Sequence, residues 1–206
     1  MIKLLVATTN KAKFAEIEAC LEKLPLKILS LQSLGCWPRV VEDGASFEEN
    51  ALKKAKTLAE YSGLLTIADD SGLEVDALNG APGIYSSRYC GEEGNDEKNN
   101  QKLLNELRGV VEEKRTARFV CALTVCDPRS PGLKHRTIRE SCEGRIALTP
   151  KGRNGFGYDP LFFYPPFGRT FGETDRETKA SVSHRGKASR KLAEILPSLA
   201  DVSPKP

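Results

Sequence analysis

The order of apolar patterns in the first 31 residues constrains the fold more than any other feature. Residues 2–7 and 26–31 each form a short apolar run typical of a buried strand. Between them, residues 11–24 carry apolar side chains three and four positions apart, which is the spacing of an amphipathic helix. Strands joined by a helix in this way predict an α/β fold.

The rest of the chain continues this alternation and then changes to a hairpin. Ser46 followed by Glu49 is the capping-box pattern that opens a helix, and Gly63 ends it. Further helices are predicted over residues 96–107 and 187–196. Further strands are predicted at residues 64–68, 73–78, 116–127 and 135–146, the last two flanking a Pro-Gly turn as an antiparallel hairpin. We therefore expect one long mixed sheet with flanking helices.

Charge balance and cysteine content exclude several classes of protein. The 206 residues include 31 Lys and Arg and 28 Asp and Glu, a net charge of +3 that is too balanced for a general nucleic-acid binder. Neither an export signal nor a membrane-spanning run precedes Thr8, so we expect a cytoplasmic protein without a membrane partner. The cysteines contain no CxxC pair and do not form a zinc-site pattern. We expect one two-lobed domain over residues 1–199 and a loose tail over 200–206.

An acidic segment separates two apolar stretches in the middle of the chain. Asp69, Asp70 and Ser71 precede Gly72, and we expect a turn that presents two carboxylates and a hydroxyl at a strand end. Carboxylate oxygens suit Mg²⁺, which keeps several waters and shares its coordination shell with phosphates. Phosphoryl chemistry is therefore the first hypothesis. Acids that only accept backbone hydrogen bonds in a turn would explain the same residues.

Two basic segments offer partners for a phosphate. The first joins the first predicted strand to the first helix and consists of Thr8, Thr9, Asn10, Lys11, Ala12 and Lys13. Its hydroxyls, helix N-terminus and lysines favour a bound phosphate, although an ordinary helix cap with solvated lysines fits equally. Lys54 can neutralise a phosphate oxygen if Glu42 and Asp70 share a Mg²⁺. Otherwise Lys54 is a solvated lysine and Glu42 a surface acid.

A glycine-rich segment near residue 156 is suited to a planar ligand. Residues 155–160 read Gly-Phe-Gly-Tyr-Asp-Pro; the glycines let a ligand approach the backbone, Phe156 offers a stacking face and Asp159 an acceptor. A tight turn with core aromatics is the alternative. Further on, Lys179 and residues 183–185 place cationic donors ahead of the last predicted helix, where they would also serve as a cap.

Four of these segments, in this order, resemble the inosine triphosphate pyrophosphatase family: residues 8–13, residues 68–73 continuing through 80–89, residues 155–160 and residues 183–185. The resemblance covers residues 7–196. It implies an elongated α/β fold with two lobes around a cleft, commonly as a homodimer. It also implies Mg²⁺-dependent cleavage of non-standard purine nucleoside triphosphates (ITP, dITP and XTP) between the α- and β-phosphates, which releases pyrophosphate and a nucleoside monophosphate.

The resemblance also implies the roles of individual residues. Asp70 matches the catalytic acid and a Mg²⁺ ligand, Glu42 a second ligand, and Ser71 a substrate contact. The triphosphate contacts implied are Thr8, Thr9, Asn10, Lys11, Ala12, Lys13 and Lys54. The nucleoside contacts implied are Phe156, Gly157, Tyr158, Asp159, Lys179, His184 and Arg185. Asp70 is the preferred base, and Asp69 stays a candidate for part of that role.

Purine selectivity has a direct explanation in these residues. Hypoxanthine and xanthine carry a 6-oxo acceptor that donors from His184 and Arg185 would pair with, whereas the 6-amino group of adenine would leave those donors unpaired. A buried unpaired donor costs about 1 to 3 kcal/mol.

Two other functions fit the same residues. One is a phosphatase, or a pyrophosphatase acting on pyrimidine or modified nucleotides. The other is a nucleotide-sensing or nucleic-acid-binding module that uses Phe156 as a stacking platform. The acidic pair Asp69 and Asp70 argues against the second, because carboxylates without a metal repel phosphate.

Overall fold

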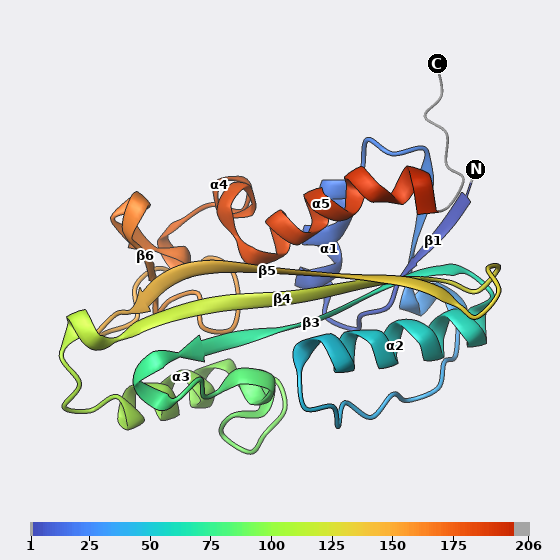
Figure 1. Ribbon diagram of the computed structural model, residues 1–206. Helices are drawn as coiled ribbons and strands as arrows, with labels where there is room; N and C mark the ends of the chain where they lie inside the picture. The colour runs from blue at the N-terminus through green and yellow to red at the C-terminus, as the bar shows by residue number, and fades with distance from the viewer. Residues whose placement is uncertain (1, 200–206) are drawn as a thin grey trace. The chain divides into compact units, whose positions relative to one another are not determined.

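A seven-stranded mixed sheet organises the chain (Figure 1). The computed structural model describes residues 2–199, and within them the strands lie in the order β2-β1-β3-β4-β5-β6-β7. The strands are β1 (Ile2–Val6), β2 (Leu26–Ser30), β3 (Leu65–Val75), β4 (Thr116–Asp127), β5 (Lys134–Ile146), β6 (Phe162–Tyr164) and β7 (Arg169–Thr170). β1 pairs in parallel with β2 and β3, whereas β6 pairs antiparallel with β5 and β7. The predicted mixed sheet is therefore confirmed.

Five α-helices accompany this sheet in the described part of the chain. They are α1 (Lys11–Leu21), α2 (Phe47–Ser62), α3 (Asp96–Glu106), α4 (Arg176–Val182) and α5 (His184–Leu199). α2 begins and ends as predicted, because Ser46 Oγ accepts the Glu49 N–H at 3.2 Å and Gly63 ends the helix with φ +65°. No helix between residues 2 and 199 is long and apolar enough to cross a membrane.

The chain divides into two compact units. The first unit consists of the described residues within Met1–Asp70, Cys121–Glu140 and Arg185–Pro206. The second unit consists of Ser71–Val120 and Ser141–His184. The tail predicted over residues 200–206 lies outside the described residues.

Alternation along the strands gives the first unit two apolar clusters. Leu4 and Ile67 belong to a cluster with buried side chains of α1 and α5. Leu5 and Ala68 belong to a different cluster, with buried side chains of α2. Because successive strand side chains point to opposite faces, α1 and α5 cover one face of β1 and β3 and α2 covers the other. The next two residues of β3 therefore also face opposite sides.

The second unit has an aromatic core. The ring centroids of Phe119 and Phe162 lie 4.5 Å apart, and those of Phe162 and Phe171 lie 5.0 Å apart. His184 stacks on Phe119 with a centroid distance of 4.9 Å. Tyr158, at the glycine-rich segment, is part of the same buried cluster. This segment is therefore anchored on the core of its own unit.

The acidic segment differs from its prediction. We expected a turn around Gly72, yet β3 runs without interruption from Leu65 to Val75. Gly72 is part of that strand and does not have the positive φ of the chain's turn glycines. Glycine permits a turn without requiring one, and the buried residues on both sides of the acids pack as one strand.

The predicted boundaries of two helices were also wrong. α1 ends at Leu21 instead of continuing to Leu24. α5 begins at His184, so His184 and Arg185 form its first turn instead of preceding it. Sequence analysis also missed α4, whose seven residues are too short to show an amphipathic period.

Candidate functional site

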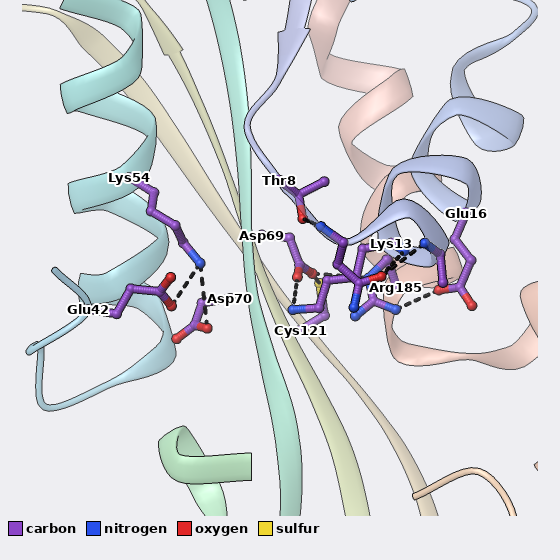
Figure 2. A network of polar contacts seen from close by, with 11 residues as sticks. Thr8, Lys13, Glu16, Glu42, Lys54, Asp69, Asp70, Cys121 and Arg185 are labelled. Atoms are coloured by element: carbon purple, nitrogen blue, oxygen red, sulfur yellow. Dashed lines mark hydrogen bonds and ion pairs between the residues drawn. The ribbon is translucent and has the colours of Figure 1, made fainter. Parts of the chain in front are cut away.

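Asp69 and Asp70 point to opposite sides of β3 (Figure 2). Asp69 lies with Lys13 from α1 and Arg185 from α5, whereas Asp70 lies with Lys54 from α2. This separation follows from the two-residue period of a strand. The two carboxylates therefore belong to different groups of side chains, and the prediction that they meet at one turn was wrong.

Asp69 is a buried anchor for two cations. Its Oδ1 lies 2.6 Å from Lys13 Nζ, and its Oδ2 accepts from Arg185 Nε and from the Cys121 thiol, both at 3.1 Å. Burial by itself would raise the pKa of Asp69, but the charges of Arg185 and Lys13 outweigh it and hold the pKa well below its usual range. Asp69 is thus ionised, with both oxygens engaged.

Arg185 is held between two carboxylates. Its side chain is fully buried, and Nη1 donates to Glu16 Oε2 at 2.5 Å while Nε donates to Asp69. Burial disfavours the charged guanidinium, but Asp69 and Glu16 overcome this and raise the pKa of Arg185. Sequence analysis missed Glu16 and Cys121. Glu16 had a weak signal, since it follows Lys13 by three positions on α1 and so shares its helix face; Cys121 had none.

Asp70 is in the opposite electrostatic situation. Lys54 Nζ donates to Glu42 Oε2 at 3.0 Å and lies 3.7 Å from Asp70 Oδ1. Within the described residues, the buried Oδ2 of Asp70 has no hydrogen-bond partner. Burial raises the pKa of Asp70 to about 6; Glu42 and Asp69 add to the rise, while Lys54 and Lys13 oppose it. Asp70 is therefore a carboxylate with an available oxygen and a pKa near neutrality.

Both acids lie just past the point where β1 leaves the sheet. The pairing of β1 with β3 ends at Val6 and Ile67, and the Ala7 N–H donates to Ile67 at 2.7 Å before the chain turns away. The loop that follows is partly closed by its own cap, because Asn10 Oδ1 accepts the backbone N–H groups of Ala12 and Lys13 at 2.9 and 3.1 Å.

This cap limits what the loop offers to a phosphate. The Ala12 and Lys13 N–H groups donate to Asn10 Oδ1, so a phosphate could accept from them only by displacing this cap. Thr8 is half-buried, whereas Thr9, Asn10, Lys11 and Ala12 are exposed. Lys13 is the member of this segment that the structure brings to the acidic residues.

The pair Glu42 and Asp70 fits a hard divalent cation. Both carboxylates contact Lys54, and the buried Asp70 Oδ2 is open to a further partner. Between residues 2 and 199, no three His, Cys, Asp or Glu side chains gather in a way that could hold a metal. Two carboxylates with the other positions left to water and phosphate is the donor set that Mg²⁺ takes in phosphoryl-transfer sites.

The glycine-rich segment forms a second group of predicted residues, in the second unit. Asp159 Oδ2 accepts the Phe156 N–H at 2.9 Å and the Lys179 ammonium at 2.5 Å. Lys179 Nζ also lies 5.0 Å from the Phe156 ring centroid. Asp159 and Lys179 are buried, while Phe156 is half-buried. Asp159 was expected to be a ligand acceptor, and its Oδ2 instead supports the loop that presents Phe156.

The conformation of this loop requires its glycines. A Cβ on Gly155, which has φ +76°, would lie 1.9 Å from Asp159 Oδ2. Gly157 has φ +61°, in the left-handed region that residues with a side chain rarely adopt.

Two other predicted contact residues also lie in the second unit. The buried Tyr158 donates its hydroxyl to Ser86 O at 2.8 Å, so this hydroxyl is used within the second unit. Ser71, also in this unit, is half-buried on β3.

The fold is α/β, and β3 carries acidic side chains, each in contact with a lysine, just past the end of its pairing with β1. Residues 4–195 match the Ham1 family, and the chain belongs to this family. The resemblance found in the sequence is thereby confirmed.

Individual relatives agree with this family membership. The dITP/XTP pyrophosphatase of Geobacter sulfurreducens is 52% identical over 196 residues, which cover 95% of this chain and 97% of that protein. The dITP/XTP pyrophosphatase of Syntrophobacter fumaroxidans is 52% identical over 189 residues, covering 92% of this chain and 79% of that one. A solved structure of a HAM1 protein from Coxiella burnetii superposes with a TM-score of 0.86 at 38% identity, covering 96% of this chain and 100% of the other.

Proposed function

We propose that this protein hydrolyses non-standard purine nucleoside triphosphates (ITP, dITP and XTP) to the nucleoside monophosphate and pyrophosphate. One observation carries the proposal: beside Glu42 and Lys54, the buried Oδ2 of Asp70 has no hydrogen-bond partner in the described part of the chain. Support comes from relatives named dITP/XTP pyrophosphatases that are about half identical over most of the chain. A binding module would not need a buried carboxylate oxygen without a hydrogen-bond partner.

Asp70 is the proposed general base. Hydrolysis of a phosphoric anhydride needs a water that loses its proton as it attacks phosphorus. In the metal-free protein a pKa of about 6 leaves Asp70 mostly ionised at neutral pH and able to accept that proton, and a Mg²⁺ bound to the carboxylate would lower this pKa.

The metal site of the proposal is Mg²⁺ held by Glu42 and Asp70. Bound there, Mg²⁺ would offset the negative charge of the phosphates. Lys54 would move its ammonium from the two carboxylates to a phosphate oxygen, because its carboxylate contacts at 3.0 and 3.7 Å are the ones that a cation would replace.

Lys13 is the second proposed phosphate cation, and Asp69 is its anchor. The Lys13 ammonium, 2.6 Å from Asp69, is held at the end of β1. A cation held in place by a buried carboxylate stabilises developing charge without first having to be ordered. We therefore assign proton transfer to Asp70 and cation positioning to Asp69. Thr8, Thr9, Asn10, Lys11, Ala12 and Ser71 complete the proposed phosphate contacts.

The purine base is the proposed ligand of the second group. Phe156 would stack on the base, and the pair Asp159 and Lys179 would hold its loop. The remaining proposed contacts of the nucleoside are Gly157, Tyr158, His184 and Arg185. His184 and Arg185 would donate to the 6-oxo group, and the contacts of Arg185 with Asp69 and Glu16 fix the direction of its guanidinium.

The proposal also includes a homodimer, a cytoplasmic setting and a single catalytic domain over residues 1–199. The first rests on the family resemblance. For the second, all six cysteines are thiols and not disulfides, as in a reducing compartment.

Turnover of ITP, ATP and GTP, with and without Mg²⁺, tests the proposal. We expect Mg²⁺-dependent release of pyrophosphate and monophosphate that favours ITP. The Asp70→Asn variant is the control for contaminating enzymes, because it should lack this activity. Orthophosphate as the product, a preference for pyrimidine nucleotides, or binding without turnover would contradict the proposal.

A further inference from the structure

The first turns of α3 hold the glycine-rich loop by its backbone. Asp96 Oδ2 accepts the Gly157 N–H at 2.6 Å. Asn100 Nδ2 donates to the Gly157 carbonyl at 2.9 Å. The two side chains lie four residues apart on α3, so they share one face of the helix. One helix face thus fixes both polar groups of a single glycine.

These contacts lie directly beside Phe156. The Gly157 N–H belongs to the peptide that joins Phe156 to Gly157, and the carbonyl of this peptide accepts from the Asp159 N–H at 3.2 Å. The Phe156 N–H is also engaged, by Asp159 Oδ2 at 2.9 Å. The backbone on both sides of the Phe156 side chain is therefore hydrogen-bonded, and Asp96 supplies the bond that comes from outside the loop.

α3 is well suited to this task. Asp96 is its first residue, where a carboxylate interacts favourably with the helix dipole, and Asn95 caps the helix by accepting the Lys98 N–H at 3.1 Å. The carboxylate of Asp96 is thus not needed as the cap. A hydrogen bond from an N–H to a carboxylate is stronger than one to a neutral acceptor.

We propose that Asp96, supported by Asn100, is a positioning residue for purine binding: it holds the 155–159 loop so that Phe156 is ready to stack on the base. This inference rests on the proposed function. A loop with two glycines has many conformations when unrestrained, and ordering it at the moment of binding would weaken affinity. The contacts to Gly157 remove that cost before the substrate arrives.

Asp96→Ala, compared with Glu97→Ala, tests the proposal. Glu97 is the neighbouring exposed acid in the same helical turn, so its loss removes the same charge but no contact to Gly157. For Asp96→Ala we expect a KM for ITP raised about tenfold, the size of one lost charge-assisted hydrogen bond, and a kcat within about twofold. Glu97→Ala should change neither. Hydrogen exchange of the peptide over residues 155–159 should accelerate in Asp96→Ala alone.

Three further variants separate positioning from a general loss of structure. Asp96→Asn keeps an oxygen that can accept the Gly157 N–H, so its KM for ITP should lie close to that of the wild type. Asn100→Ala, compared with Gln101→Ala, tests the other half of the contact and serves if Asp96→Ala does not fold. Asn100→Ala should raise the KM and Gln101→Ala should not.

The outcomes keep the two proposals distinct. If the wild-type protein does not hydrolyse ITP, the proposed function fails and this inference with it. If the wild-type protein is active but Asp96→Ala matches Glu97→Ala in KM and in loop exchange, this inference alone is overturned. A fall in kcat at unchanged KM would overturn it too, because a positioning role in base binding acts on KM.

Discussion

At the scale of single residues, two adjacent aspartates have opposite environments. Asp69 binds Lys13, Arg185 and Cys121, whereas Asp70 lies near Lys54 and its buried Oδ2 has no hydrogen-bond partner among residues 2–199. The pKa of Asp69 is held down by cations, and the pKa of Asp70 is raised by burial. The same Asp→Asn substitution should therefore have a different effect at Asp69 than at Asp70.

Asp70→Asn should lose activity and keep the fold. We expect ITP turnover to fall by about 10² to 10⁴, the contribution of a general base. A raised pKa means that the folded protein disfavours the charged form, so the neutral Asn should leave the unfolding free energy at pH 7 unchanged or higher. Steady-state kinetics and urea unfolding of the metal-free protein measure the two effects. Turnover near that of the wild type would remove Asp70 from the mechanism.

Asp69→Asn should destabilise the protein. The amide removes the negative charge that Lys13 and Arg185 share, which leaves Arg185 with Glu16 alone; breaking a buried ion pair by removing one partner costs about 3 to 5 kcal/mol. Urea unfolding beside Asp70→Asn makes a matched comparison, since the same change is made one position apart. Equal stability of the two variants would contradict the anchoring role of Asp69.

At the scale of elements, the sequence predicted those boundaries that depend on local chemistry. Ser46 and Gly63 flank α2 and cap its two ends through contacts with nearby residues of the chain, and both predictions are confirmed. The strand β3 was mispredicted because the partners that allow it to carry buried acids come from distant segments: Lys13 and Arg185 for Asp69. No local sequence pattern predicts those ion pairs.

The turn between β4 and β5 gives a pH-dependent prediction. Asp127 accepts from the Arg129 backbone at 3.0 Å and from its guanidinium at 2.8 Å, and the Arg129 hydrogen bond lowers the pKa of Asp127. A lowered folded pKa stabilises the protein above the ordinary carboxyl pKa, and this stabilisation disappears as pH falls through the folded value.

Asp127→Asn should therefore be less stable than the wild type by about 1 kcal/mol at pH 7, with the difference vanishing in strong acid. Urea unfolding at neutral pH and below pH 3 checks this. A difference that is the same at both pH values would show that the charge of Asp127 does not matter.

At the scale of the whole molecule, sequence analysis identified candidate residues that carry charge or special backbone geometry and missed the residues that contact them. Lys54 and Asp70 belong to a recognisable motif set and do lie together. Glu16, Cys121 and Asp96 have ordinary surroundings in the sequence; only folding brings them to Arg185, Asp69 and Gly157. These contacts link segments far apart in the chain, which no spacing rule reports.

Mg²⁺ should stabilise the intact protein through the Glu42 and Asp70 pair. A ligand that binds only the folded state raises the melting temperature with its concentration, so the wild type should melt higher in Mg²⁺ with pyrophosphate. Glu42→Gln should lose this rise. Asp43→Asn is the matched control, because Asp43 pairs with the exposed Lys53 and not with Asp70. A rise retained in Glu42→Gln would argue against this metal site.

The thiol of Cys121 gives the first unit a built-in reporter. It is fully buried against Asp69, and burial raises its pKa well above the ordinary value, so almost no thiolate exists in the folded state. Alkylating reagents attack the thiolate and should first modify the exposed Cys36. The rate at which Cys121 is labelled would then measure how often β4 opens, and a substrate bound by Lys13 and Lys54, as proposed, should lower that rate.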